Sequence, residues 1–128
     1  MNFIPATAVK TGESTAQVTA LGSTFAFESK APLGELAEGE GNAVLGVRPE
    51  FLKLKAGTNK ATVYATLPAG METTVKLETP NGTMLTSVEF GSVDYQLNEP
   101  VSYEIAGDGI ILFDKKSENN IGKGFVRA

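Results

Sequence analysis

Residues 72–90 read ETTVKLETPNGTMLTSVEF and carry the clearest structural signal in the chain. In the first half, apolar and polar residues alternate, which predicts a strand with one largely apolar face. The residues on that face are Val75, Leu77 and Thr79. Asn81-Gly82 then favours the two positive φ values of a tight type I′ turn. A return strand follows, with one face formed by Met84, Thr86, Val88 and Phe90. The stretch therefore predicts an antiparallel hairpin.

Similar short runs lie on both sides of this hairpin, separated by many of the 14 glycines and 6 prolines. They cover residues 17–21, 24–28, 42–47, 60–67, 101–105 and 110–113. Regularly spaced short strands are typical of sandwiches and barrels. Residues 33–41 have weak helical character, but three glycines interrupt them. Residues 115–128 predict a polar turn followed by a last strand or a loose tail. We expect one all-β domain of short antiparallel strands over residues 1–128.

The composition limits the chemistry that the chain can perform. Its 128 residues include no Cys, His or Trp, and 11 Lys and Arg stand against 15 Asp and Glu, for a formal charge of −4. Thiolate chemistry, an imidazole base and His-ligated zinc are therefore excluded. We expect no catalytic, cofactor-binding or metal-binding residues and do not expect a free-standing enzyme. The mild acidity also argues against nucleic-acid binding, which usually requires basic surfaces.

Three local patterns resemble functional sites but have simpler interpretations. Residues 41–46 have the glycine spacing of a phosphate-binding loop, yet Val47-Arg48 stands where Lys and Ser or Thr are required, so a strand is favoured. An acidic cluster lacks the pattern of a calcium loop and predicts a solvated loop. It comprises Glu35, Glu38 and Glu40. A basic strip could serve an oligonucleotide-binding barrel, but core and solvated-face positions are favoured. It comprises Lys53, Lys55, Lys60 and Tyr64.

Residues 46–52 read GVRPEFL and contain a more specific pattern. Proline favours an extended conformation for Arg48, and an Arg followed two residues later by Glu50 can bridge structural neighbours, which predicts a strand end held by an ion pair. The segment also resembles the G-[IVL]-R-P-E-H-[LF] signature in the C-terminal domain of ATPase subunits of sugar-importing ABC transporters, such as the maltose and glycerol-phosphate importers. Three more segments are similar to that family in the same order. They are residues 1–5 (MNFIP), 70–73 (GMET) and 112–114 (LFD).

The resemblance implies an OB-fold-like β-barrel of the TOBE/MOP type, preceded in the family by an ATPase domain that this chain does not include. It implies a non-catalytic regulatory and dimerisation domain of an ABC importer for sugars or related small solutes. The implied partners are a second copy, the ATPase domain of the same subunit and, in some members, a regulatory protein. The implied location is cytoplasmic, at the inner membrane through other transporter subunits. The interface and structural candidates are Arg48, Pro49, Glu50, Glu72, Thr73, Leu112, Phe113 and Asp114.

The chain departs from the family pattern at two positions. Phe51 and Ile111 stand where the family commonly has His, so polar contacts made there by relatives would be apolar here. Residues 66–69 also differ from the usual E-x-L-G. An OB-like module that binds a small ligand or oxyanion, or single-stranded nucleic acid, remains the alternative function.

Overall fold

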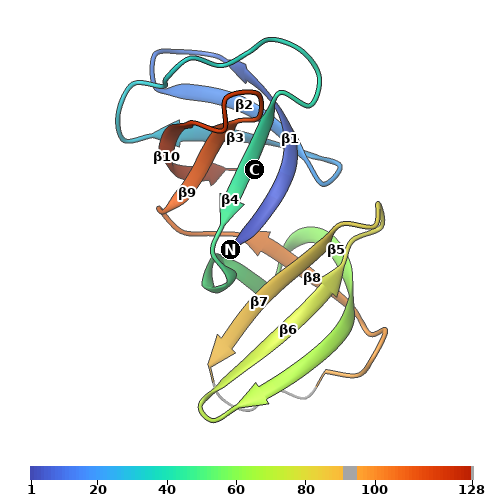
Figure 1. Cartoon of the computed structure of the whole chain (residues 1–128). Helices are drawn as coiled ribbons and strands as arrows, with labels where there is room; N and C mark the ends of the chain where they lie inside the picture. Colours follow the sequence, from blue (N-terminus) through green and yellow to red (C-terminus); the bar gives the residue numbers. More distant parts are fainter. Residues whose placement is uncertain (91–94, 128) are drawn as a thin grey trace. The chain divides into compact units, whose positions relative to one another are not determined.

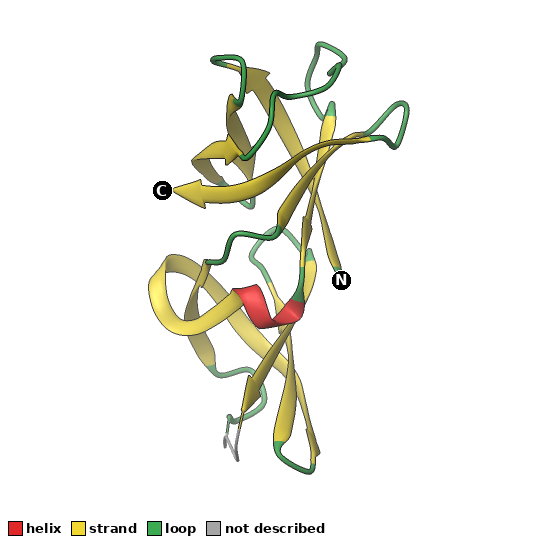
Figure 2. Cartoon of the chain, turned by 90° about the vertical axis from the view of Figure 1, so that its left-hand side faces the viewer, coloured by secondary structure: helices red, strands yellow, loops and turns green. Residues whose placement is uncertain are grey.

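The computed structural model describes residues 1–90 and 95–127. Within this part of the chain, nearly all regular structure is β-strand, and the one helical element is the 3-10 helix η1 (Pro49–Phe51) (Figure 2). The strands form a closed barrel and a separate four-stranded sheet, both visible in Figure 1. The chain divides into two compact units. The sheet unit comprises residues 1–2 and 48–105, and the barrel unit comprises residues 3–47 and 106–128.

The barrel contains six strands in the closed order β1-β2-β3-β10-β9-β4. The strand pairs with defined register are antiparallel. The six strands are β1 (Asn2–Lys10), β2 (Thr15–Ala20), β3 (Ser23–Ser29), β4 (Ala43–Val47), β9 (Ile110–Asp114) and β10 (Asn120–Arg127).

Alternation along each strand fills the interior of the barrel. The inward side chains are fully buried and apolar, and each contributes about 1.5–3 kcal/mol relative to an exposed side chain. They include Ile4, Val18, Phe27, Leu45, Ile110 and Leu112. Close strand packing also explains one glycine, because a Cβ at Gly124 would collide with the backbone carbonyl of Glu28 on β3.

The sheet unit has the strand order β7-β6-β5-β8. Its strands are β5 (Leu52–Ala69), β6 (Glu72–Glu78), β7 (Met84–Phe90) and β8 (Pro100–Ile105). The 18-residue β5 pairs with β8 on both sides of an irregularity between Leu54 and Asn59, where Lys55 and Gly57 have positive φ. Figure 2 shows this strand as a curled ribbon. The curl lets one strand wrap a core that contains Leu52, Val63, Leu77, Leu85 and Tyr103.

The predicted all-β, OB-like barrel class is confirmed, and so is the hairpin of residues 72–90. The predicted type I′ turn at Asn81-Gly82 is wrong, because only Gly82 has positive φ, at 86°. The loop is longer: Thr79 and Thr83 close it with a backbone hydrogen bond, and the Thr79 hydroxyl also accepts the Thr83 N–H. The pair of positive φ values lies instead at Leu21 and Gly22, between β2 and β3.

Other local predictions had mixed outcomes. The end of the chain forms strand β10 rather than a loose tail. The regular alternation predicted over residues 60–67 is wrong, because a bulge at Tyr64 shifts the register between Val63 and Ala65 and leaves Leu67 half exposed. Such a bulge reverses the faces of the residues that follow. The part of the chain described here has no helix long and apolar enough to cross a membrane. Whether the two units act as one domain stays a prediction.

Candidate functional site

The segment GVRPEFL forms a tight turn that leads into the sheet unit. Arg48 is extended (φ −66°, ψ 147°), as expected before proline, and its carbonyl accepts a hydrogen bond from the Phe51 N–H at 2.9 Å. The Pro49 carbonyl accepts the Leu52 N–H. Neither Arg48 nor Glu50 belongs to the ion pairs found in the described residues, so the predicted ion pair at this strand end is wrong. Both side chains are exposed, and exposed charges gain little free energy from pairing in water. The turn is held by its backbone.

A buried serine attaches this turn to β7. The Ser87 hydroxyl is fully buried and donates to the Leu52 carbonyl at 2.7 Å. Glu50 and Leu52 then share a hollow of about 260 Å³ with the end of β7. The β7 residues that line it are Val88, Glu89 and Phe90. The hollow thus brings the carboxylates of Glu50 and Glu89 beside the apolar side chains of Val88 and Phe90.

The second predicted pair lies on the same sheet. Glu72 is exposed at the start of β6 and is registered between Ala69 on β5 and Phe90 on β7. Thr73 is buried and has polar contacts within the chain. The structure therefore places Glu72 and the Glu50 hollow against the same end of β7, since both adjoin Phe90.

The third predicted segment lies in the barrel unit and its three residues have different environments. Leu112 is fully buried in the barrel core. Phe113 points outward, with its ring centroid 6.1 Å from that of Phe3 on β1. Asp114 is 5% exposed and turns back to the loop before β4. These residues belong to a different unit from Arg48 and Glu72, so the predicted set forms two groups.

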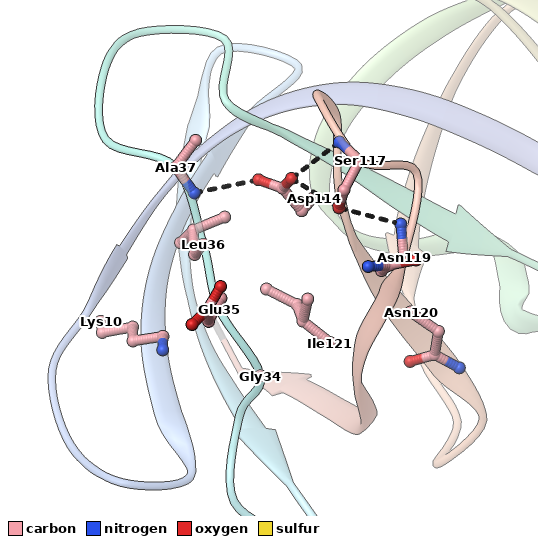
Figure 3. A pocket seen from close by; sticks show the side chains of 10 residues that line it. All are labelled: Lys10, Gly34, Glu35, Leu36, Ala37, Asp114, Ser117, Asn119, Asn120 and Ile121. Atoms are coloured by element: carbon pink, nitrogen blue, oxygen red, sulfur yellow. Dashed lines mark hydrogen bonds between the residues drawn. The ribbon is translucent and has the colours of Figure 1, made fainter.

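Asp114 anchors two loops of the barrel unit (Figure 3). One carboxylate oxygen accepts the Ala37 N–H at 3.0 Å, and the other accepts the Ser117 N–H at 2.9 Å and the Ser117 hydroxyl at 2.7 Å. These donors, the Ala37 N–H first, hold the pKa of Asp114 below its ordinary value. The carboxylate is therefore an ionised anchor whose oxygens already have hydrogen-bond partners.

A hollow of about 760 Å³ adjoins this anchor. Figure 3 shows Lys10, Glu35, Asn119 and Asn120 around it, with Ile121 at its base. Its charged and amide side chains are exposed, and it is an open hydrogen-bonding surface. Within residues 1–90 and 95–127, no group of three or more carboxylates is arranged to hold a metal ion.

One member of the basic strip packs against an aromatic ring of the sheet unit. Lys55, at a positive φ of 60°, places its ammonium 5.1 Å from the centre of the Tyr95 ring. The Tyr95 hydroxyl donates to Glu89 at 3.1 Å. Burial, and next the charge of Glu89, raise the pKa of Tyr95 to about 12. Lys55 is thus engaged in a packed cluster of the sheet unit.

Sequence reasoning missed two asparagines that organise both units. The Asn42 side chain accepts the Ala8 N–H and donates to the Ala8 carbonyl, both at 2.8 Å, and donates to the Ala37 carbonyl at 2.7 Å. The Asn2 side chain makes the same pair of bonds to the backbone of Thr86. The only signal available was a polar residue at the start of a strand, Asn2 in β1 and Asn42 directly before β4, and many asparagines with no such role share that position.

Comparison with known proteins gives no assignment: no family model matches the chain, and no curated protein matches it.

Proposed function

We propose that this chain is a non-catalytic regulatory and dimerisation domain of the ATPase subunit of an ABC importer for sugars or related small solutes. The observation that carries the proposal is the order of four short segments, at residues 1–5, 46–52, 70–73 and 112–114, which resembles that family along nearly the whole chain. An OB-like barrel is the fold that the resemblance implies, and the barrel unit has that class.

The positions of these segments are compatible with a structural role. Segment 46–52 is the turn that leads from the barrel unit into the sheet unit, and segment 70–73 opens the central hairpin. Neither gathers an acid, a base and a nucleophile. In this proposal, ATP hydrolysis belongs to a domain that precedes the chain, and the chain contributes pairing and regulation at the cytoplasmic face of the membrane.

The reading frame upstream of residue 1 tests the proposal directly. We expect it to encode a phosphate-binding loop, a Walker B segment and an ABC signature motif. A second test is calorimetric titration of the chain with Mg-ATP, for which we expect no binding heat. An upstream frame without ATPase motifs, or saturable ATP binding by the chain itself, would contradict the proposal. Oligonucleotide binding that weakens steeply with salt would favour a nucleic-acid module instead.

A further inference from the structure

Three neighbouring strands of the barrel present an outward face without charged residues. The order β1-β4-β9 places these strands side by side, as Figure 1 shows. Positions 3 to 9 of β1 alternate, and the outward side chains are apolar or, at Thr7, uncharged. Val44 and Gly46 on β4 are registered with Phe113 and Ile111 on β9. We call the apolar members of this face the apolar wall. They are Phe3, Pro5, Val9, Val44, Ile111 and Phe113.

Two of these side chains are unusually exposed for their type, Phe3 at 64% and Val9 at 60%. The opposite strands, β2, β3 and β10, are different. Their outward positions carry mostly hydroxyl, amide and charged side chains, with Ala26 and Phe125 as apolar exceptions. Several of the polar ones pair with each other: Arg127 lies 3.4 Å from Glu28, and the Thr19 and Thr24 hydroxyls are 3.4 Å apart. The outward face of β2, β3 and β10 is therefore mostly polar, whereas the apolar wall has the composition of an interaction surface.

The apolar wall has a hollow with charges of both signs at its rim. Phe3, Val44 and Phe113 line this hollow of about 500 Å³ together with Asp114, whose carboxylate is bonded within the barrel unit, and Lys115 and Glu118 border it. Neither rim charge belongs to the ion pairs found within the described chain. Glu118 also has a φ of 63°, a left-handed conformation in which Gly or Asn is usual. The rim thus offers one cation and one anion beside the apolar side chains of the hollow.

We infer that the apolar wall is the surface on which a second copy of this chain docks. Apolar side chains give no repulsion between two identical faces, and the two charges that an ion pair between copies needs, Lys115 and Glu118, lie on the same rim. A two-fold interface uses the same patch on both copies, so a patch with both charges complements itself. The inference rests on the dimerisation proposed above and adds the surface that performs it.

Sedimentation velocity of the chain over about 1 µM to 1 mM tests this inference. We expect a weak dimer, with a dissociation constant on the order of 10–100 µM, because three short strands give an interface at the small end of the usual range. Phe3→Glu should raise that constant at least tenfold. Thr24→Glu is the matched control, since it adds the same charge to an exposed position on β3, and it should leave the constant unchanged.

The rim charges give a second, independent measurement. Lys115→Glu should weaken the dimer about threefold to fivefold, and Lys115→Glu combined with Glu118→Lys should restore it to within about twofold. Circular dichroism confirms that each variant is folded. A strict monomer at about 1 mM, or a dimer that Phe3→Glu does not weaken, would overturn the inference. Neither result bears on whether the upstream reading frame encodes ATPase motifs, so the proposed function is tested separately.

Discussion

The barrel unit and the sheet unit use the same side-chain device for different purposes. In each, one asparagine carboxamide bonds both the N–H and the C=O of a single strand residue, as a neighbouring strand would. Asn42 does so with Ala8 of β1 at 2.8 Å for both bonds. Asn2 does so with Thr86 of β7, where the N–H bond is 2.6 Å and the C=O bond is 2.8 Å.

The two positions differ in what the asparagine replaces. Asn42 directly precedes β4, the neighbour of β1 in the barrel, so its side chain continues the pairing that closes the ring. It also fixes the preceding loop through the Ala37 carbonyl. Thr86 lies on an edge strand of an open sheet, and Asn2 covers part of that edge. The difference indicates that the barrel needs its asparagine for closure, whereas the sheet needs its own to protect an edge.

The largest effect is expected from Asn42→Ala. This change removes three hydrogen bonds and leaves buried backbone groups of Ala8 without partners, and we expect a loss of about 3 kcal/mol in the free energy of unfolding. Urea denaturation measures it. Asn42→Asp is the matched control: it keeps the acceptor for the Ala8 N–H but puts a carboxylate against two carbonyls, so it should not restore stability. A loss below about 1 kcal/mol for Asn42→Ala would contradict a role in closure.

Asn2→Ala should have a smaller effect, about 1–2 kcal/mol, because two bonds are lost and Thr86 can be solvated at the sheet edge. Hydrogen exchange locates the effect: the Thr86 amide should lose protection while the amides of β2 and β3 keep theirs. Equal loss of protection in β2 and β3 would show that Asn2 supports the barrel as much as the sheet.

Acid should act on the barrel unit through Asp114. Its folded pKa is lowered, so its contribution to stability is complete above the ordinary value of 3.8 and is lost as pH falls through the lowered pKa. Asp114→Asn cannot ionise, and we expect it to flatten the decline of stability below about pH 4. All three tyrosines lie in the sheet unit, so an acid titration of unfolding followed by far-UV circular dichroism compares the variant with the parent chain. Parallel curves would contradict this assignment.

Alkali should act on the sheet unit, with the smallest effect. Burial raises the pKa of Tyr103 to about 12, and burial and then Glu89 do the same for Tyr95. Both groups favour their neutral form in the fold, so their contribution is present below the ordinary pKa of 10.0 and is lost as pH rises through about 12. Absorbance of tyrosinate should show two tyrosines still protonated at about pH 11. Full ionisation there in folded protein would contradict the burial of these hydroxyls.

The sequence predicted the strands that alternate clearly and missed the features that depend on distant partners. The hairpin β6–β7 was predictable because its pattern and turn are local. The two-unit arrangement and the pairing of β4 with β9, whose registered residues are at least 65 positions apart, leave no local signal. Among the site residues, Asp114 was named from a short resemblance, but its bonds to Ala37 and Ser117 depend on the fold. The positive φ of Leu21 in the turn between β2 and β3 was not predictable, since leucine rarely adopts positive φ.

The division of the chain has a consequence for the order of folding. Residues 48–105 are contiguous and hold the four sheet strands, whereas the barrel needs residues from both sides of this insertion. Contacts between nearby residues form faster than contacts that must close a long loop. During synthesis, β1 to β4 emerge first but lack β9 and β10 until the insertion has been made. We therefore expect the sheet to gain protection before the barrel, and the first third of the chain to wait longest for its partners.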